Sequence, residues 1–460
     1  MSDISTSVKE TQSENKMGTM PVNKLLITMS VPMMLSMLVQ ALYNIVDSIF
    51  VAQISENALT AVSLAFPIQS LMIALGAGTG VGINALLSRS LGAKNKEMVD
   101  AVAKHGILLA GLSYLLFLFV GIFAIKPFYY AQTADTEIIS YGIDYLTIVC
   151  CCSFGIYMQF IFERLLQATG RTAHAMISQL LGAFINLILD PILIFGLFGI
   201  PAMGVKGAAL ATVTGQIIAG IVAIFINIYM NKDVNISMKG FRPSLSTIGQ
   251  IYAIGIPSII MQSIGSVMVF CLNKILIGFS TTATAVFGVY FKLQSFVFMP
   301  IIGMNNGMVP IVAFNLGAKS KERMMKTFRL SLLYAFIIMT IGLVIFEAIP
   351  EKLFLLFDAS EHMLSMGVPA LRIIALHFPI AAVCVITGSM FQAVGKAVYS
   401  MISSICRQLV VLLPVAFLLA QIGNVNYVWL AFPIAEAVTL VINVIFFIII
   451  YKKVINPIAS

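Results

Sequence analysis

Long apolar runs separated by short polar segments make up most of this chain. About 20 consecutive apolar residues are enough for a helix to cross the hydrocarbon core of a bilayer. We therefore predict an all-α polytopic membrane protein, whose longest helices tilt, kink or extend past the membrane surface. The twelve predicted transmembrane helices lie near residues 25–53, 58–87, 102–124, 138–168, 173–198, 206–230, 248–277, 283–315, 328–349, 363–393, 398–421 and 427–451.

Polar segments divide the chain. Residues 1–20 are rich in Ser, Thr, Lys and Glu and lack an apolar core, so we expect a disordered tail and no cleavable signal peptide. The most polar interruption, 231–246, holds three basic residues and a proline and is interpreted as a linker between two halves. The predicted division is a disordered cytoplasmic tail over 1–23, an amino-terminal lobe over 24–230, a cytoplasmic linker over 231–247, a carboxy-terminal lobe over 248–453 and a tail over 454–460.

The composition excludes a soluble protein. Hydrophobic residues make up 60% of the chain and charged residues 10%, with a mean hydropathy of +1.00, whereas about a quarter of the residues are charged in a soluble domain. The pI of about 9.1 does not indicate nucleic-acid binding, because the basic residues lie in loops. All six cysteines lie in apolar runs without a Cys-x-x-Cys spacing, so we expect reduced packing residues.

The distribution of lysine and arginine predicts the orientation of the helices. With the amino terminus in the cytoplasm, the cytoplasmic loops and tails hold most of the basic residues, including the cluster in 319–329. The outer loops then hold only Lys126, Lys206 and Lys352. Because basic residues favour the cytoplasmic side, we predict a multi-pass protein of the bacterial cytoplasmic membrane with both termini in the cytoplasm.

The two halves form an internal repeat. The segment Leu91-Gly-Ala-Lys-Asn-Lys matches Leu316-Gly-Ala-Lys-Ser-Lys, and Gln167-Ala-Thr-Gly-Arg matches Gln392-Ala-Val-Gly-Lys, both 225 positions apart (316 − 91). Each half holds six spans, an even number, so both halves insert with the same orientation. We expect two lobes related by an axis along the membrane normal, with a cavity between them. Such an arrangement favours transport over a duplicated fold without transport function.

Acidic residues lie deep in the apolar runs of the first half. Asp47, Glu163 and Asp190 have no acidic counterpart at the repeat offset. A carboxylate inside a membrane costs a few kcal/mol or more and is a functional-site candidate by default. A purely architectural role should have recurred in both halves, so the asymmetry indicates a functional site in the first lobe.

Each of these acids also has a simpler interpretation. Asp190 could be a structural carboxylate that fixes a kink at Pro191. Asp47 could be a surface acid that extends to the outer water. Glu163 could form a local ion pair with Arg164, the next residue in the chain.

The residues around Asp190 could form one polar cluster. Asn186 lies four residues earlier, on the same face of the helix. A rise of about 1.5 Å per residue places Asp47, Tyr145 and Thr212 at a similar depth. Because removal from water favours the protonated form of a carboxyl group, such a cluster can hold a proton and release it when a cation arrives. The oxygens of Asp47, Asn186 and Asp190 could instead coordinate Na⁺, and the sequence leaves both ions open.

The second half has a different set of charges. Lys292 and Glu436 both fall on the outward side of their spans, and we expect them to pair across the bundle. The chain has no Gly-x-x-x-x-Gly-Lys-Ser/Thr loop, and its four histidines form no metal-binding pattern. We therefore expect no cofactor and no use of ATP. We also expect no enzymatic activity, because no nucleophile–base pair or metal-ligand set is evident.

Several sequence blocks stand out within these spans. They are Pro32, Val46-Asp47-Ser48, Glu163-Arg-Leu-Leu-Gln-Ala-Thr-Gly170, the run from Asn186 to Pro191, and Gly207-Ala-Ala-Leu-Ala-Thr212. Together with the twelve spans in two halves, these blocks resemble the multidrug and toxic compound extrusion (MATE) family. The resemblance covers the chain from about Lys24 to Lys453 and is strongest to the DinF-type branch and, within it, to the MepA-like multidrug exporters.

The resemblance implies a MATE-type fold of two six-helix lobes. It also implies secondary active export of lipophilic cationic drugs and dyes by antiport with H⁺ or Na⁺, with alternating access between the lobes. We expect a monomer in the lipid bilayer with no nucleic-acid partner. The implied cation-coupling residues are Asp47, Tyr145, Asn186, Asp190 and Thr212. The substrate-binding candidates are Glu163, Asp190, Gln69 and Gln294.

One departure from the family and one alternative function bear on these expectations. The NorM-type branch uses acids in spans 7 and 10, where this chain has Gln262 and only Glu361 at the outer edge. We therefore expect coupling in the first lobe alone. The alternative is a lipid-linked saccharide flippase with a similar duplicated fold. A flippase cavity should carry several Arg or Lys residues for pyrophosphate, whereas the deep charges of the first half are acids, which favours cationic substrates.

Overall fold

The computed structural model describes residues 15–357 and 359–458. Within these residues, ten helical segments are long and apolar enough to cross a membrane, and two bent helix pairs bring the number of spans to twelve. The described part of the chain contains helices and connecting turns and no strand. The predicted all-α membrane fold is therefore confirmed.

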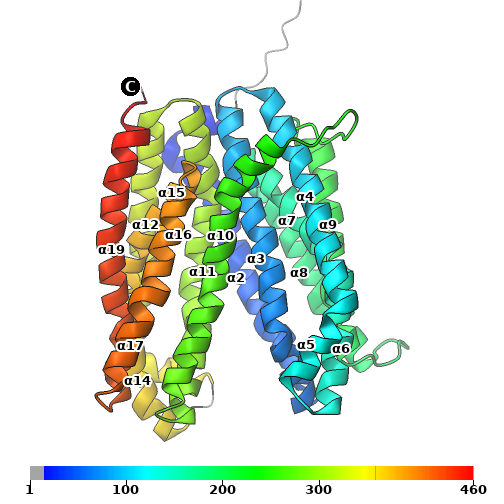
Figure 1. Cartoon of the computed structure of the whole chain (residues 1–460), viewed down its shortest axis with the longest axis vertical. Coiled ribbons are helices and arrows are strands. Elements are labelled where there is room, and N and C mark those ends of the chain that lie inside the picture. Colours follow the sequence, from blue (N-terminus) through cyan, green and yellow to red (C-terminus); the bar gives the residue numbers. More distant parts are fainter. Residues whose placement is uncertain (1–14, 358, 459–460) are drawn as a thin grey trace, which may run out of the picture.

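The first lobe contains six of these spans (Figure 1). They are α2 (Val22–Ala52), α3 (Glu56–Gly92), α4 (Lys96–Phe123), α6 (Thr136–Cys151) with α7 (Phe154–Ala168), α8 (Thr172–Phe195) and α9 (Val205–Met230). Two short helices accompany them, α1 (Lys16–Thr19) before the first span and α5 (Ile125–Gln132) after α4.

The second lobe contains the other six spans. They are α10 (Leu245–Leu276), α11 (Thr281–Gly317), α12 (Lys321–Ala348), α14 (Glu361–Ala375) with α15 (Phe378–Ala393), α16 (Ala397–Ile405) with a π-helix (Cys406–Leu412) and α17 (Leu413–Ala420), and α18 (Val425–Trp429) with α19 (Ala431–Ile450) and a π-helix (Tyr451–Ile455). The short helix α13 (Pro350–Leu355) lies between α12 and α14.

The fourth span of each lobe is bent where we expected a continuous helix. The bend is 44° between α6 and α7 and 48° between α14 and α15. In the second lobe Pro379 lies at the start of α15, and a proline has no backbone N–H to continue the hydrogen bonds of the preceding helix. The first lobe bends at the equivalent place without a proline, so the bend belongs to the repeated fold.

Local backbone features recur at the repeat offset. Ser55 and Ser280 cap α3 and α11 by accepting a hydrogen bond from the backbone N–H of the third residue beyond them. Lys94 and Lys319 then follow these helices with φ of 56° and 57°, a left-handed conformation that few side chains adopt. Equal strain at equivalent positions confirms that the two lobes repeat one backbone.

Glycines hold the two lobes together in a crossed arrangement. α3 of the first lobe packs against α10 of the second, and α11 packs against α2. A Cβ atom on Gly82 would lie 2.2 Å from the backbone oxygen of Ile251, and one on Gly307 would lie 2.5 Å from Ser30 Oγ. The two glycines are equivalent in the repeat, so the same close contact is made twice between the lobes.

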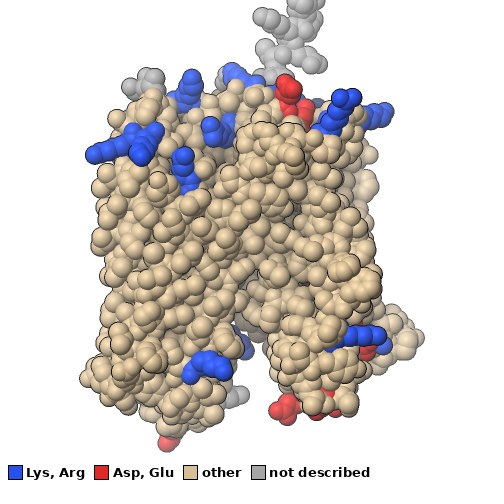
Figure 2. All heavy atoms as spheres, in the orientation of Figure 1, with Lys and Arg blue, Asp and Glu red and all other residues tan. Residues whose placement is uncertain are grey.

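The two ends of the molecule differ in shape and charge. Figure 1 shows the lobes close together at the end that carries the carboxy terminus and spread apart at the opposite end. Figure 2 shows a hollow between the lobes at that opposite end, and Lys and Arg gathered mainly around the closed end. The structure is therefore open on one side of the predicted membrane only.

The amino-terminal segment departs from the expectation of a disordered tail over 1–23. Residues 1–14 lie outside the described part, but Lys16–Thr19 form the helix α1 and α2 begins at Val22. Asn15 caps α1 through its side-chain oxygen, and the Met17 side chain is fully buried. The expectation was wrong for these residues because it rested on composition, whereas their order comes from contacts with distant helices.

Candidate functional site

Two carboxyl groups lie together where α2 packs against α8. Asp47 on α2 and Asp190 on α8 are within hydrogen-bonding reach of each other. Asp190 is only 1% exposed, so little water is available to separate the two charges. A hydrogen bond between two carboxyl groups requires a proton on one of them, because charged carboxylates offer only acceptors and repel each other. The pair is therefore suited to holding one proton.

Asn186 and Thr212 complete this group. Asn186 Nδ2 lies 3.3 Å from Asp190 Oδ1 and 3.4 Å from Thr212 Oγ1. In the charged state of the pair, the buried atoms Asp47 Oδ1, Asn186 Oδ1 and Asp190 Oδ2 have no donor among the described residues. Buried acceptors without a donor are costly. A shared proton would satisfy the carboxyl oxygens, and a bound Na⁺ would be the other cation that this oxygen set could accept.

Tyrosines border the acid pair. Tyr145 on α6 is buried beside Asp47 and Asp190, and Gln69 on α3 donates a hydrogen bond of 3.0 Å from Nε2 to Tyr145 Oη. Tyr43 lies one helical turn before Asp47 and faces the same pair. The structure thus brings together all five predicted coupling residues, and it adds Tyr43, which the sequence analysis did not select.

Glu163 borders a small pocket in the same lobe. The pocket has a volume of about 80 Å³ and is lined by residues of α2, α7, α8 and α9, including Tyr43, Glu163, Asn186 and Thr212. Glu163 is 5% exposed and accepts hydrogen bonds from Gln159 Nε2 at 3.0 Å and Ser178 Oγ at 3.2 Å. The pocket is far smaller than the ~300–1,000 Å³ of drug-binding sites. We refer to it as the acid pocket.

The alternative of a local ion pair between Glu163 and Arg164 is not observed. Arg164 Nη1 instead donates to Gln167 Oε1 at 2.8 Å and to Asn306 Oδ1 of the second lobe at 2.9 Å. Consecutive residues on a helix point about 100° apart, so Glu163 faces into its own lobe while Arg164 faces the other lobe.

A row of polar side chains on α2 leads to the acid pair, and the sequence analysis missed it. Gln179 on α8 donates from Nε2 to Gln40 Oε1 at 2.8 Å and accepts a hydrogen bond from Ser36 Oγ. Ser36, Gln40, Tyr43 and Asp47 are spaced by four, three and four residues, which places them on one helix face. That spacing inside an apolar span was the signal that could have identified them.

The structure also places Gln294 and Lys292, the two residues of the second half for which roles were predicted. Gln294 is partly buried on α11 and does not line the acid pocket or the central cavity described below. The expected pairing of Lys292 with Glu436 was wrong, because Glu436 Oε1 lies 3.5 Å from Arg407 Nη1. Lys292 is exposed, with Nζ 5.9 Å from the centre of the Phe357 ring. Among the described residues, no acid lies within ion-pair distance of Lys292.

A larger cavity lies between the lobes. It has a volume of about 350 Å³ and is lined by α3 and α7 of the first lobe and by α10, α11, α15, α16, the following π-helix and α19 of the second. Its charged lining residues are Arg164 and Arg407, and no acidic residue of the described chain lines it. We refer to it as the central cavity.

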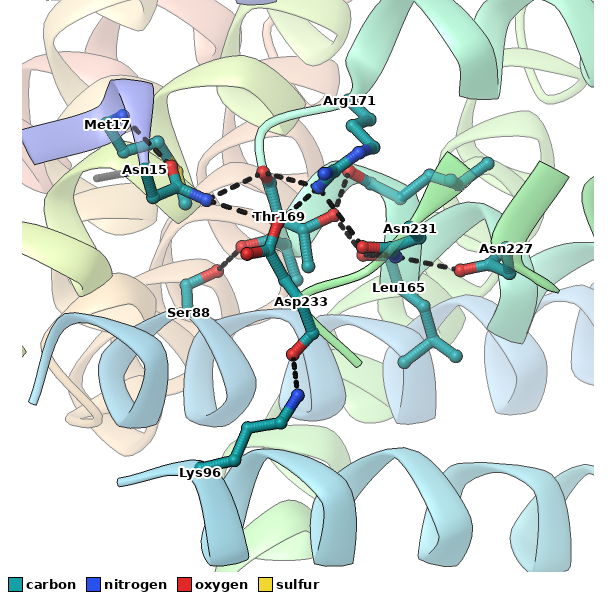
Figure 3. A network of polar contacts seen from close by, with 12 residues as sticks. Asn15, Met17, Ser88, Lys96, Leu165, Thr169, Arg171, Asn227, Asn231 and Asp233 are labelled. Atoms are coloured by element: carbon teal, nitrogen blue, oxygen red, sulfur yellow. Dashed lines mark hydrogen bonds and ion pairs between the residues drawn. The ribbon is translucent and has the colours of Figure 1, made fainter. Parts of the chain in front are cut away.

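The closed end is held by a polar network (Figure 3). Asp233, between α9 and α10, pairs with Arg171, and its backbone oxygen accepts a hydrogen bond of 2.6 Å from Lys96 Nζ. Asn15 Nδ2 donates to the backbone oxygen of Thr169 at 3.2 Å, which attaches the segment before α1 to the first lobe. These contacts join α1, the α7–α8 turn and the segment after α9 at the end where the lobes meet.

The same amino-terminal segment is bound to the second lobe. Arg323 Nη2 donates to the backbone oxygens of Met17 at 3.1 Å and Met20 at 2.7 Å. Asn315 Nδ2 also donates to the Met17 oxygen, at 3.3 Å. α1 therefore bridges both lobes at the closed end.

Comparison with known proteins places this architecture in a family. The family described as MatE matches residues 32–192 and 257–418, one match in each lobe, with starting points separated by the repeat offset. Similar sequences include "Multidrug export protein MepA" of Staphylococcus haemolyticus, 27% identical over 90% of this chain and 91% of that protein. The protein of the same name from Staphylococcus aureus strain MRSA252 is 27% identical over 89% and 90%.

Solved structures match over nearly the whole chain. One is described as an outward-facing conformation of a multidrug resistance MATE family transporter of the MOP superfamily, with a TM-score of 0.91, 26% identity and coverage of 97% of this chain and 99% of that one. Another, a MOP superfamily transporter from Pyrococcus furiosus described as having a binding pocket of reverse polarity, has a TM-score of 0.90, 26% identity and the same coverage. With both repeats matched and the whole fold shared, this chain belongs to the MATE family of membrane transporters.

Proposed function

We propose that this chain exports lipophilic organic cations across the cytoplasmic membrane in exchange for protons. The observation that carries the proposal is the buried Asp47–Asp190 pair, whose facing oxygens need a proton. Family membership supports a transport role, and the relatives named as multidrug export proteins support drugs as the cargo. Na⁺ is the alternative coupling ion, because Asn186 Oδ1 adds a third unpartnered oxygen to the group.

The acid pocket supports a simple exchange cycle. When the Asp47–Asp190 pair and Glu163 are negatively charged, they attract a cation from the cytoplasmic side. Protonation from the outside neutralises these acids and removes the attraction, so the cation leaves to the outside. Release of the protons to the cytoplasm restores the charge for the next cycle. Each proton that moves inward gains about 2.3 kcal/mol per 100 mV of membrane potential.

The orientation in this proposal follows from charge. Lys and Arg gather at the closed end of the molecule (Figure 2), and basic residues favour the cytoplasmic side of a membrane. We therefore assign the closed end and both termini to the cytoplasm, so that the hollow opens to the outside. A single chain without ATP is the proposed transport unit.

A lipid-linked saccharide flippase is the second candidate, and one observation favours it. Arg164 and Arg407 line the central cavity, and guanidinium groups suit a pyrophosphate. Arg407 is already paired with Glu436, and the charge of the neighbouring Glu163 acts on Arg164. The cavity therefore offers little net positive charge to a ligand with several negative charges. The exporter is therefore preferred.

The proposal can be tested in proteoliposomes with a fluorescent cationic dye. Wild-type protein should accumulate dye when a proton gradient alone is imposed and should not do so with a Na⁺ gradient alone. The reverse result would assign the coupling to Na⁺. Binding of a lipid pyrophosphate together with no transport of any lipophilic cation would reject the exporter in favour of the flippase.

A further inference from the structure

The amino-terminal segment 15–20 lies beside the place where the two lobes touch at the closed end. There the ends of α3 and α11 meet so closely that a Cβ atom on Gly92 would lie 1.9 Å from the backbone oxygen of Phe314. The ring of Phe314 lies on the other side against α1, with Cε1 3.2 Å from the position of a Cβ atom on Gly18. The segment is therefore packed against the contact that must separate if the closed end is to open.

Met17 is buried between the two lobes. Its side chain is fully buried and belongs to the same apolar cluster as the core of the second lobe. Its Cγ also lies 3.4 Å from the position of a Cβ atom on Gly170, in the α7–α8 turn of the first lobe. Because exposure of an apolar side chain to water is unfavourable, removal of α1 from this place is opposed by the burial of Met17.

The backbone of the segment offers free carbonyl groups because a proline follows it. In a continuous helix the Met17 carbonyl would accept from the backbone N–H of residue 21, but Pro21 has none. Arg323 Nη2 and Asn315 Nδ2 of the second lobe donate to the Met17 oxygen instead, at 3.1 Å and 3.3 Å. The same Nη2 donates to the Met20 oxygen at 2.7 Å. The second lobe thus holds the end of α1 by hydrogen bonds from a charged donor, which are stronger than those from a neutral one.

The first lobe holds the start of the same segment. Asn15 Nδ2 donates to the backbone oxygen of Thr169 at 3.2 Å and to Asp233 Oδ2 at 3.5 Å, as Figure 3 shows. Asn15 also caps α1, since its side-chain oxygen accepts a hydrogen bond from the backbone N–H of Met17. Beyond Met20 the chain continues into α2, the first span of this lobe. The segment is therefore attached to the first lobe at both of its ends.

The linker between the lobes occupies the comparable place before α10, and it shows what is unusual about the amino-terminal segment. The backbone N–H groups of Asn235 and Ser244 donate to Asp100 Oδ1 and His105 Nε2 of α4, both at 2.8 Å. The linker must contact both lobes because it joins them. The amino-terminal segment precedes the first lobe in the chain, so no covalent connection brings it to the second lobe. Its contacts there depend on non-covalent bonds that can be broken and remade.

We propose that residues 15–20 form a strap that keeps this end of the transporter closed and that leaves the second lobe when the end opens. The bonds that break are those with Arg323 and Asn315, because the strap stays attached to the first lobe through Asn15 and α2. The strength of the strap then sets which fraction of the molecules is open at this end. The inference rests on the proposed function in one respect, since exchange across the membrane requires the closed end to open in turn.

Distances between two spin labels test this proposal without a dye or an ion gradient. Glu97→Cys at the start of α4 and Lys453→Cys in the last π-helix place labels at exposed positions of the two lobes, once the six native cysteines have been replaced by alanine. Arg323→Gln should raise the ratio of the longer to the shorter distance population by about tenfold, the scale of a charge-assisted hydrogen bond. Arg329→Gln, at an exposed position of the same helix, is the matched control and should match the parent protein. An unchanged distribution in Arg323→Gln would overturn the proposal.

Asn15→Ala distinguishes a strap from two separate supports of the fold. It removes the cap of α1 and the contacts with Thr169 and Asp233, so it should also enlarge the longer-distance population. In the double variant with Arg323→Gln the second change should add little, because a strap that is released at one end no longer holds through the other. Additive changes would mean that the two residues act independently and would contradict the strap. If Arg323→Gln does not fold, the distances in Asn15→Ala decide, and no change there rejects the proposal.

The strap and the proposed function can fail separately. Dye transport by the parent protein is measured in proteoliposomes, apart from the distances. Proton-driven dye transport together with unchanged distances in the variants would reject the strap and leave the exporter in place. Changed distances in the variants without dye transport by the parent would support the strap and reject the proposed function.

Discussion

The acid pocket and the central cavity differ in volume, in the charge of the residues that border them and in their position in the fold. The acid pocket, about 80 Å³, lies within the first lobe and is bordered by Glu163, whereas the central cavity, about 350 Å³, lies between the lobes and is lined by Arg164. Neighbouring residues on one helix thus supply opposite charges to two spaces. A site within one lobe can keep its geometry while the lobes move, but a space between lobes must change shape. The two spaces can therefore respond differently when the lobes move.

A comparison of the two lobes also shows which features the duplication preserved. Both lobes contain the crossed glycine contacts, the serine helix caps and a lysine with a left-handed backbone conformation. The acids do not recur, since Asp47, Glu163 and Asp190 have no acidic equivalents. Packing between helices is shared by both copies and constrains both, while a polar residue in one lobe can change without effect on the other lobe's fold.

The largest expected effect comes from Asp190→Asn. Asparagine keeps the shape of the side chain but cannot gain and lose a proton. We expect at least a tenfold loss of gradient-driven dye accumulation in inverted vesicles, normalised to protein amount, because the pair can no longer exchange its charge. Asp47→Asn should lose less, because Asp47 is less buried than Asp190.

The control for this experiment is Asp144→Asn. Asp144 is an acid of the same lobe that pairs with Lys206 at 3.3 Å and is 34% exposed, so its loss should not change accumulation. If Asp190→Asn accumulates dye as the wild type does while Asp47→Asn does not, α8 is only a scaffold and α2 carries the ion.

The next largest effect is expected for substitutions of the two glycines at the contacts between the lobes. In Gly82→Ala, the new methyl group would lie 2.2 Å from the Ile251 backbone oxygen, and in Gly307→Ala 2.5 Å from Ser30 Oγ. We expect both variants to unfold at a lower temperature than the wild type, with a loss of about 1–3 kcal/mol typical of overpacking. Gly249→Ala is the control, since nothing lies within 4 Å of its added Cβ. A strong effect of only one of the two would contradict the symmetry of the interface.

A smaller effect is expected for Glu163→Gln. The glutamine can still accept hydrogen bonds from Gln159 and Ser178, so the fold should be retained while the negative charge is lost. We expect severalfold weaker binding of a lipophilic cationic dye to the purified protein. Unchanged dye binding in the folded variant would show that the Glu163 charge does not contribute to cation binding.

The smallest effect is expected for Lys292→Met. Lys292 is exposed, and its nearest charge-related contact is the Phe357 ring at 5.9 Å. Surface substitutions of this kind usually change stability by about 0.5 kcal/mol or less. Thermal unfolding and transport per folded molecule should both match the wild type. Normal folding with abolished transport would move the coupling site to the second lobe.

Much of the fold could be predicted because it follows from one-dimensional patterns. Apolar length defines the spans, and the repeat offset relates the lobes. The acid cluster was also predictable, because Asn186 and Asp190 share a helix face and depth can be counted along a helix from the membrane surface. These inferences need the geometry of single helices only.

The rest depends on how helices rotate against each other. Glu436 pairs with Arg407 and not with Lys292, because α19 faces the π-helix after α16, a relation that depth alone does not determine. The central cavity could not be predicted for the same reason, since its lining comes from both lobes. The order of α1 was missed because its partners, such as Arg323, lie 306 positions away in sequence.

That distance has a consequence for the biogenesis of the protein. α1 leaves the ribosome before the second lobe is made, and Arg323, which binds its backbone through Met17 and Met20, is made only after eight spans, from α2 to α11. The first of its second-lobe partners, Asn315, lies near the end of α11, so the contacts of the amino-terminal segment with the second lobe are completed only when α12 has been synthesised. Closure of this end of the molecule is therefore a late step of assembly, and a chain truncated before α11 would insert into the membrane without it.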